Sequence, residues 1–233
     1  MKRKPKLWLI LPDAHFPEHD TAAIACVQRV NDLLRPDEVL VLGDWLDNEK
    51  FSNHARATVE DMQGPSYQDV MSQVNAELDS LQQYGASLTY LEGNHEAWVE
   101  RWCVKNAGLA APDVYEVMSP RHIIAKDRKD FTWVPYIQKQ VTKFVMAPNL
   151  WACHGFSHGT HAATAHMRLV PGLSIVFGHV HRAMSVTTRN PGTDAPITGW
   201  SPGCLCKMQP TYVHGAPTAW THGFTLLYQS RRN

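Results

Sequence analysis

Short apolar runs alternate with longer amphipathic segments through the first hundred residues. The runs at residues 7–11, 39–42 and 88–91 have the length and composition of buried strands. The segments at residues 21–34 and 66–84 have the spacing of apolar positions expected of helices. This alternation of strand and helix predicts parallel βαβ units.

Capping residues mark the ends of these helices. Asp20 or Thr21 can cap the first helix, and Pro36 lies just beyond its end. Gly85 stands at the C-terminal end of the second helix, where a left-handed residue is common. A third helix is expected to begin near Glu96 and to include residues 96–104.

The second half of the chain is dominated by strand-like runs that follow one another closely. A single helix is expected there, at residues 160–169. Such spacing favours an antiparallel or mixed sheet, and two stacked sheets with helices outside accommodate the whole pattern. The predicted strands of this half are residues 131–137, 141–146, 150–153, 174–177, 183–188, 197–200 and 224–228.

Composition narrows the class of protein. The chain has 233 residues, 44% hydrophobic and 19% charged, which predicts one globular domain over residues 1–233. The formal net charge is zero, so no general attraction to nucleic acid or to an anionic membrane is expected. No apolar run approaches the length of a membrane span, and the run at residues 7–11 is too short for a signal peptide.

The five cysteines form no regular framework, so we expect free thiols and a cytoplasmic location. Cys204 and Cys206 flank Leu205 and could contact a metal ion. A single C-x-C without a second pair favours packed or free thiols instead.

Polar residues of a few types follow five of the predicted strands. In open α/β sheets, ligands bind beyond the carboxyl ends of the strands. Several of these polar residues stand beside a glycine, which lets backbone approach closely. The five groups are Asp13 with His15, Asp44 with Asp47, Asn94 with His95 and Glu96, His154 alone, and His179 with His181.

Each group taken alone has an ordinary structural interpretation, as a turn, a solvated loop or a helix cap. Their occurrence together after five strands favours a metal site, because carboxylate, amide and imidazole groups are the ligands of manganese, iron, zinc and similar ions.

The order and form of these groups resemble the calcineurin-like metallophosphoesterase superfamily. Its motifs are D-x-H, G-D-x-x-D, G-N-H-E, an isolated histidine and G-H-x-H, and this chain carries all five in order between Asp13 and His181. The resemblance implies a four-layer α/β/β/α sandwich of two mixed sheets flanked by helices.

The resemblance also implies two divalent metal ions, with Asp44 bridging them. One ion would be held by Asp13, His15, Asp44 and His181, and the second by Asp44, Asn94, His154 and His179. The two histidines of the sequence GHVH, at residues 178–181, would therefore serve different ions.

The family pattern makes His95 the catalytic histidine and not a metal ligand. It would stabilise charge at the scissile group or protonate the leaving oxygen. Asp47 matches the position that orients this histidine, although a plain loop carboxylate is the alternative. Glu96 is expected to be a residue of the first helical turn rather than a catalyst.

One departure from the family concerns phosphate binding. The phosphoprotein phosphatases continue the second motif with an arginine that grips phosphate, whereas this chain has Asn48 there, which argues against a protein phosphatase of that branch. Asn94 and His95 are expected to contact the substrate. Further candidates for substrate contact, each with a surface role as the alternative, are Arg56, Arg101, Arg182, His158 and His161.

The C-terminal region, residues 200–224, is similar to the tails of small phosphoesterases encoded by tailed bacteriophages. Tyr212 and Trp220 could stack on a base if they lie at the edge of the site. Core packing is the alternative.

These observations predict a two-metal phosphoesterase that uses a metal-bridging hydroxide. The preferred substrate is a phosphodiester, such as DNA, RNA or a nucleotide. The alternatives are a phosphomonoesterase and a non-catalytic nucleic-acid-binding module with structural metals. Mn²⁺ is the expected ion, and Fe, Zn, Co and Ni suit the same ligands. No membrane partner is expected, and the sequence carries no signal for an oligomeric state.

Overall fold

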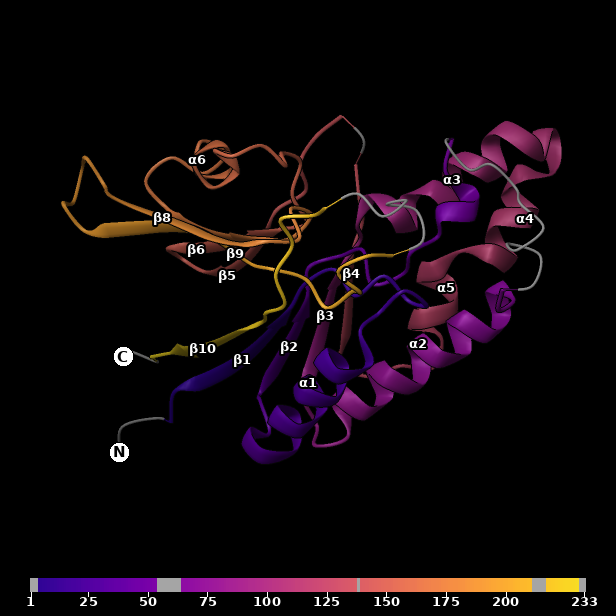
Figure 1. The fold of residues 1–233 in the computed structure, drawn as a ribbon, viewed down its shortest axis with the longest axis horizontal. Coiled ribbons are helices and arrows are strands. Elements are labelled where there is room, and N and C mark those ends of the chain that lie inside the picture. The colour runs from indigo at the N-terminus through magenta and orange to yellow at the C-terminus, as the bar shows by residue number, and fades with distance from the viewer. Residues whose placement is uncertain (1–3, 54–63, 138, 211–216, 231–233) are drawn as a thin grey trace.

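The first sheet contains the three strands that the apolar runs of the first hundred residues predicted, together with two strands from the second half. In the computed structural model, which describes residues 4–53, 64–137, 139–210 and 217–230, its five strands have the order β10-β1-β2-β3-β4 (Figure 1). Strands β1 to β4 run parallel, and β10 pairs antiparallel with β1. The strands are β1 Lys6–Leu11, β2 Glu38–Val41, β3 Ser87–Leu91, β4 Phe131–Val134 and β10 Thr225–Gln229.

The second sheet has the order β5-β6-β7-β9-β8. Its central strands β6, β7 and β9 are parallel, and the outer strands β5 and β8 are antiparallel to their neighbours. The strands are β5 Phe144–Ala147, β6 Leu150–Cys153, β7 Ser174–Phe177, β8 Ala183–Arg189 and β9 Pro196–Pro202. The mixed sheet predicted for the second half is confirmed.

Two strands lie in a different sheet from the one that their neighbours in sequence suggested. The run at residues 131–137 was grouped with the later strands, but β4 is parallel to β3 in the first sheet. The run at residues 224–228 likewise returns to the first sheet as β10. Both placements depend on pairing with β3 and β1, which a local pattern of apolar residues does not report.

The helices lie on the outer faces of the sheets, as Figure 1 shows: α1 and α2 cover the first sheet and α6 covers the second. The helix predicted at residues 21–34 is confirmed to the residue, with the Ala23 N–H donating to the Asp20 cap over 2.8 Å. The helices are α1 Thr21–Leu34, α2 Tyr67–Gln82, α3 Asn94–Asn106, α4 Ala111–Met118, α5 Pro120–Ala125, α6 Ala162–Met167 and the short 3₁₀ turns Glu49–Phe51 and Gly108–Ala110.

The central strands of the first sheet are apolar on both faces because each face is covered. Leu9 and Leu11 of β1 pack with α1 and α2, whereas Trp8 and Ile10, which point the other way, pack between the two sheets. A third cluster joins α6 to β7 through Phe177. Helices, sheet, sheet and helix therefore form four layers, and the predicted α/β/β/α sandwich is confirmed.

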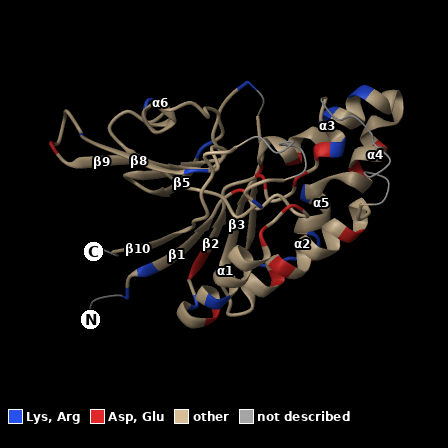
Figure 2. Cartoon of the chain, in the orientation of Figure 1, with Lys and Arg blue, Asp and Glu red and all other residues tan. Residues whose placement is uncertain are grey.

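Charged residues do not segregate by sign. Figure 2 shows basic and acidic residues dispersed over the helices of the first sheet, in keeping with the zero net charge of the sequence. None of the described helices is long and apolar enough to cross a membrane.

Candidate metal centre

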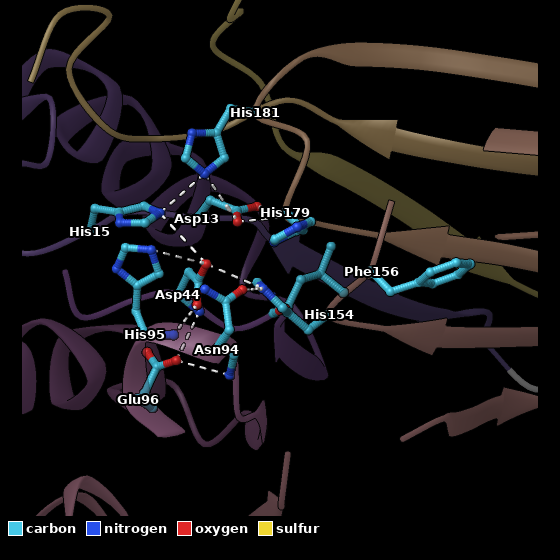
Figure 3. Close-up of polar contacts among 12 residues, drawn as sticks. Asp13, His15, Asp44, Asn94, His95, Glu96, His154, Phe156, His179 and His181 are labelled. Atoms are coloured by element: carbon cyan, nitrogen blue, oxygen red, sulfur yellow. Dashed lines mark hydrogen bonds and ion pairs between the residues drawn. The ribbon is translucent and has the colours of Figure 1, made fainter. Parts of the chain in front are cut away.

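The polar groups that follow the strands meet at one edge of the sandwich. Strands β1, β2 and β3 are parallel neighbours, so their carboxyl ends lie together, and the same holds for β6 and β7. Figure 3 shows the side chains converging around Asp44, which follows β2. The seven predicted metal ligands gathered there are Asp13, His15, Asp44, Asn94, His154, His179 and His181.

One group of donors, here called side A, consists of Asp13, His15 and His181 together with Asp44. Their donor atoms lie within 4.8 Å of one another. The Nε2 atoms of His15 and His181 are 3.1 Å apart, and His181 Nε2 is 3.4 Å from Asp13 Oδ1. All four residues are buried. This is the set that the family pattern predicts for the first ion.

The other group, side B, consists of Asn94, His154 and His179 and shares Asp44. His154 Nε2 lies 3.2 Å from Asp44 Oδ2 and 3.0 Å from Asn94 Oδ1. Donor atoms of Asp44, His154 and His179 again lie within 4.8 Å of one another. Asp44 therefore stands between the two groups, in the position of a bridging carboxylate (Figure 3).

The orientation of the imidazoles fits metal binding. Metal-ligating histidines usually bind through one nitrogen and hydrogen-bond through the other. His154 Nδ1 donates to the backbone oxygen of Leu42 over 2.8 Å, and His15 Nδ1 lies 3.1 Å from Asp47 Oδ1. Their Nε2 atoms are left facing the centre. The nitrogen and oxygen donors of the two groups support a site for two divalent metal ions.

Burial leaves several of these imidazoles in the neutral form that metals require. It lowers the pKa of His15 to about 4 and that of His179 to about 3, with neighbouring histidines adding to the effect. Burial acts the same way on His154, but the Asp44 carboxylate outweighs it and raises the pKa of His154 to about 9. Metal binding at side B therefore competes with a proton on His154.

Two glycines allow the backbones to approach the ligand carboxylates. A Cβ on Gly93 would lie 2.1 Å from Asp44 Oδ1, and a Cβ on Gly178 would lie 2.6 Å from Asp13 Oδ2. Both distances are shorter than the 3.0 Å below which a Cβ atom essentially never approaches another heavy atom. A larger residue in place of the glycine of G-N-H-E or G-H-x-H would therefore collide with a ligand carboxylate.

Four of the predicted ligands have left-handed backbone conformations. The φ angles are 55° for His15, 48° for Asp44, 70° for His179 and 55° for His181. A non-glycine residue in this region costs about 1–3 kcal/mol, and such strain clusters at functional sites. The surrounding hydrogen bonds hold the strain, among them those from the N–H of His179 to both carboxylate oxygens of Asp13.

Glu96 does more than occupy the first turn of a helix, which is the role that the sequence predicted for it. Its buried carboxylate accepts hydrogen bonds from the N–H groups of Asp44 and Leu46, both over 3.0 Å, and from Gly93 N and the Tyr90 hydroxyl. Burial and the charge of Asp44 raise its pKa to about 7. Glu96 thus holds the loop that presents Asp44, which the sequence did not reveal.

His95 lies beside Asp44 without joining either donor group in the predicted sets. Its Nε2 is 3.9 Å from Asp44 Oδ2, its N–H donates to Asp44 Oδ1 over 2.9 Å, and its Nδ1 donates to the backbone oxygen of Asp47. The Asp47 carboxylate is 3.7 Å from His95 Nδ1 but 3.1 Å from His15 Nδ1. Asp47 thus contacts a predicted ligand as well as the predicted catalytic histidine.

The remaining candidates for substrate contact differ in how close they lie to the centre, and two of them lie outside the described residues. Arg56 and Tyr212 lie outside the described residues. The exposed His158 reaches the rim of side B, with its ring 6.0 Å from that of His179. Trp220 lies against side A, with its ring 4.3 Å from that of His181. His161 is exposed and precedes α6.

The two candidate arginines have different surroundings. The guanidinium of Arg101 donates to the backbone oxygen of Asn94 over 3.3 Å, and its buried Nε has no hydrogen-bond partner among the described residues. Burial lowers its pKa. Arg182 instead donates to the backbone oxygens of His158 and Gly159 and braces their loop.

A cavity opens next to side B. Its volume is about 190 Å³, and His154 forms part of its wall. Tyr136 and Lys139, from the connection between β4 and β5, and Phe156, just beyond β6, line it as well.

The C-x-C pair lies behind side A. Cys206 Sγ is 3.9 Å from His181 Nδ1, and Cys204 Sγ is 3.7 Å from the backbone oxygen of Thr221. Both thiols are buried, and none of the five cysteines forms a disulfide. Cys206 thus contacts a predicted ligand through the nitrogen that points away from the centre.

Comparison with known proteins gives distant relatives. No protein-family model matches the chain. It is 25% identical over 232 residues to the Gene 54 protein of Mycobacterium phage L5, a match that covers 94% of this chain and 87% of that protein.

Solved structures with a similar outline are more distant in sequence. A dimetal phosphatase from Danio rerio is 10% identical, covers 98% of this chain and 94% of its own, and gives a TM-score of 0.45. A single mutant of Vps29 from Entamoeba histolytica is 12% identical, covers 96% and 87%, and gives 0.43. Pseudomonas putida nuclease MPE is 15% identical, covers 87% and 75%, and gives 0.36.

Sequence, fold and site agree with one another. The five motifs occur in the expected order, the two mixed sheets form the expected four layers, and the strand ends bring the seven predicted ligands to one place. The predicted four-layer fold and the gathering of the predicted ligands at one edge are therefore confirmed, and the ordered motifs resemble those of the calcineurin-like metallophosphoesterases.

Proposed function

We propose that this protein is a two-metal phosphodiesterase that hydrolyses nucleic acid or nucleotides. The observation that supports the proposal most strongly is the position of Asp44. This single buried carboxylate belongs to both donor groups, side A and side B. Asp13, His15 and His181 would hold one ion with Asp44, and Asn94, His154 and His179 the other. Two such ions would neutralise the anionic phosphate oxygens and supply hydroxide near neutral pH.

The remaining chemistry falls to His95. Its Nδ1 is occupied by the Asp47 backbone oxygen, so its Nε2 is the nitrogen that faces Asp44 and the substrate. Burial lowers the pKa of His95, while Asp44 and Asp47 act against that shift. When protonated, Nε2 can donate to the leaving oxygen, and Asp47 would orient the ring.

A diester is favoured over a monoester by the surroundings of the centre. A diester carries an organic group on each side of phosphorus, so it needs room on both sides. The cavity lined by Phe156 lies beside side B and offers room for the second organic group, which a monoester lacks. Asn94, His95 and His158 would contact the substrate. Arg56 is a further candidate that lies outside the described residues.

Manganese is the ion we propose, because mixed carboxylate, amide and imidazole donors suit it. We further propose that the protein acts in the cytoplasm of a host cell. The relative from a bacteriophage and the five free cysteines support this location.

The test compares bis-p-nitrophenyl phosphate with p-nitrophenyl phosphate at saturating Mn²⁺. We expect preference for the diester, and we expect His95→Ala to lower kcat by about 10²–10⁴-fold with an unchanged metal content. His122→Ala, which removes a histidine on α5 that pairs with Glu116, is the matched control.

Preference for the monoester would replace this proposal with a phosphomonoesterase. Two bound metals without turnover of either ester would support the non-catalytic module instead.

A further inference from the structure

The cavity beside side B, here called the side pocket, shares a wall with the candidate centre. His154 belongs to both, since its Nε2 contacts Asp44 and its ring lines the pocket. The ring of Tyr136 stands edge-on to that of His154, with centroids 6.4 Å apart and an interplanar angle of 72°. The pocket therefore lies next to the place that a phosphate held at Asp44 would occupy.

The size of the pocket limits what it can hold. Sites that bury a drug-sized ligand have roughly 300–1,000 Å³. At about 190 Å³, the side pocket is smaller and suits one ring system with its attachment rather than a whole nucleotide.

Apolar and aromatic side chains form much of the pocket wall beside the polar Glu92, Gln140 and Thr142, and two of the apolar side chains are exposed to solvent. Phe156 is 44% exposed and Ile137 is 47% exposed. Exposed apolar side chains grouped at a cavity mark a binding surface more often than a solitary exposed one does. Lys139, exposed at the same wall, adds positive charge suited to an adjoining phosphate.

Phe156 is held in place although it is exposed. Its N–H donates to His166 Nε2 over 3.1 Å, and its ring lies 4.5 Å from the His166 ring. His166 is itself fixed, because its Nδ1 donates to the backbone oxygen of Ala162 and its ring stacks on Phe177. Figure 3 shows Phe156 beyond His154, on the side away from His15. A flat group that enters the pocket therefore meets a preformed aromatic surface.

We propose that the side pocket binds the base of the nucleotide on one side of the scissile phosphate. Every base has a flat aromatic face, so stacking on Phe156 and Tyr136 would be tolerant of sequence. The inference rests on the proposed function, since it places one substituent of the diester on side B. Binding of a base in the side pocket would make the protein selective for nucleoside diesters over simple alkyl diesters.

The decisive experiment varies only the group that would enter the pocket. Thymidine 5′-(p-nitrophenyl phosphate) and methyl p-nitrophenyl phosphate have the same leaving group and differ in the second substituent. We expect kcat/KM to be about 5–150-fold higher for the thymidine ester, the equivalent of about 1–3 kcal/mol of stacking on one base. Phe156→Ala should bring the ratio of the two values toward one.

Two variants control this result. Phe156→Tyr keeps the ring and should keep the ratio. Tyr228→Ala removes a ring that is 63% exposed on β10, away from the pocket, and should leave the ratio unchanged. A ratio near one in the unmodified protein, or a high ratio that survives Phe156→Ala, would overturn the pocket inference while the proposed function stands.

Binding without turnover separates the two proposals fully. Thymidine 5′-monophosphate is titrated into chelator-treated protein, and saturation transfer to its base protons is followed by NMR. Transfer that is lost in Phe156→Ala supports the base pocket even if neither ester is hydrolysed, an outcome that would sink the proposed function alone. Absence of transfer in the unmodified protein would overturn the pocket.

Discussion

The two sides of the candidate centre share Asp44 but differ in how they are enclosed. On side A, Asp13 is 0%, His15 1% and His181 7% exposed. On side B, only His154 is buried, whereas Asn94 and His179 are half-buried. Side A is backed by Asp47, Cys206 and Trp220, whereas side B adjoins the side pocket.

This difference indicates a division of labour. A fully enclosed donor group holds an ion firmly, because its members cannot exchange their contacts for water. A half-open group leaves room for substrate to approach. We expect side A to set the affinity of the centre for its first ion and side B to set access to the phosphate.

The largest expected effect comes from removing the residue that both sides share. Asp44→Ala should reduce bound metal to well below one ion per chain and lower kcat/KM by at least about 10³-fold, because two-metal charge stabilisation contributes several kcal/mol. Metal content is measured by mass spectrometry of the dialysed protein, and turnover with bis-p-nitrophenyl phosphate.

Single-sided variants sharpen the same comparison. His181→Ala and His179→Ala each remove a donor from one side and should leave more metal bound than Asp44→Ala does. Asp113→Ala, an exposed change on α4, is the control for loss of a carboxylate. Full metal content in Asp44→Ala would show that the two sides do not share a bridging ligand.

The next effect concerns His166, which holds Phe156 at the side pocket, and it depends on pH. Burial lowers the pKa of the fully buried His166 to about 4, from 6.5 in the unfolded chain. Its neutral form therefore stabilises the fold above pH 6.5, and this contribution is lost as the pH falls from 6.5 toward 4. The linkage amounts to about 2 kcal/mol between pH 7.5 and pH 5.

Urea unfolding of the unmodified protein and of His166→Gln at these two pH values isolates that contribution. The other titrating groups are common to both proteins, so the fall in free energy of unfolding should be about 2 kcal/mol smaller in the variant. If the free energy of unfolding fell equally in the two proteins, His166 would be protonated to the same extent in the folded and the unfolded state. His122→Gln, on the partly exposed side chain of α5, should behave as the unmodified protein does.

The predicted ligands came from local signals, which is why the sequence revealed them. Each stands directly after an apolar run, and parallel strands bring such positions together. The helix Thr21–Leu34 could also be predicted from local signals, because Asp20 caps its start and Pro36 lies beyond its end.

What the sequence did not reveal depends on contacts between distant residues. The place of β10 follows from pairing Lys6 with Gln229, and that of β4 from pairing Leu88 with Phe131. Glu96 looks like any first-turn acid until its four hydrogen-bond donors are seen. Helices α4 and α5 were also not predicted, although each carries a local signal, a proline in its first turn.

The smallest effect tests the enclosure of side A. Cys206 Sγ is the neighbour of His181 Nδ1, and a thiol is a weaker acceptor than the carboxylate or carbonyl that usually orients a metal-ligating histidine. Loss of such a partner typically costs about 10–100-fold in metal affinity, so we expect Cys206→Ala to cost about 10-fold, at the lower end of that range. Affinity is measured by competition with a chelating dye.

Cys103→Ala is the matched control, because it removes an equally buried thiol from α3. If both variants weaken binding alike, the loss reflects packing, and Cys206 does not orient His181. If only Cys206→Ala weakens binding, and only for one of the two ions, the enclosed side depends on a neighbour beyond its ligands. Side B should then keep its affinity, since His154 is oriented by the backbone oxygen of Leu42, which no side-chain substitution removes.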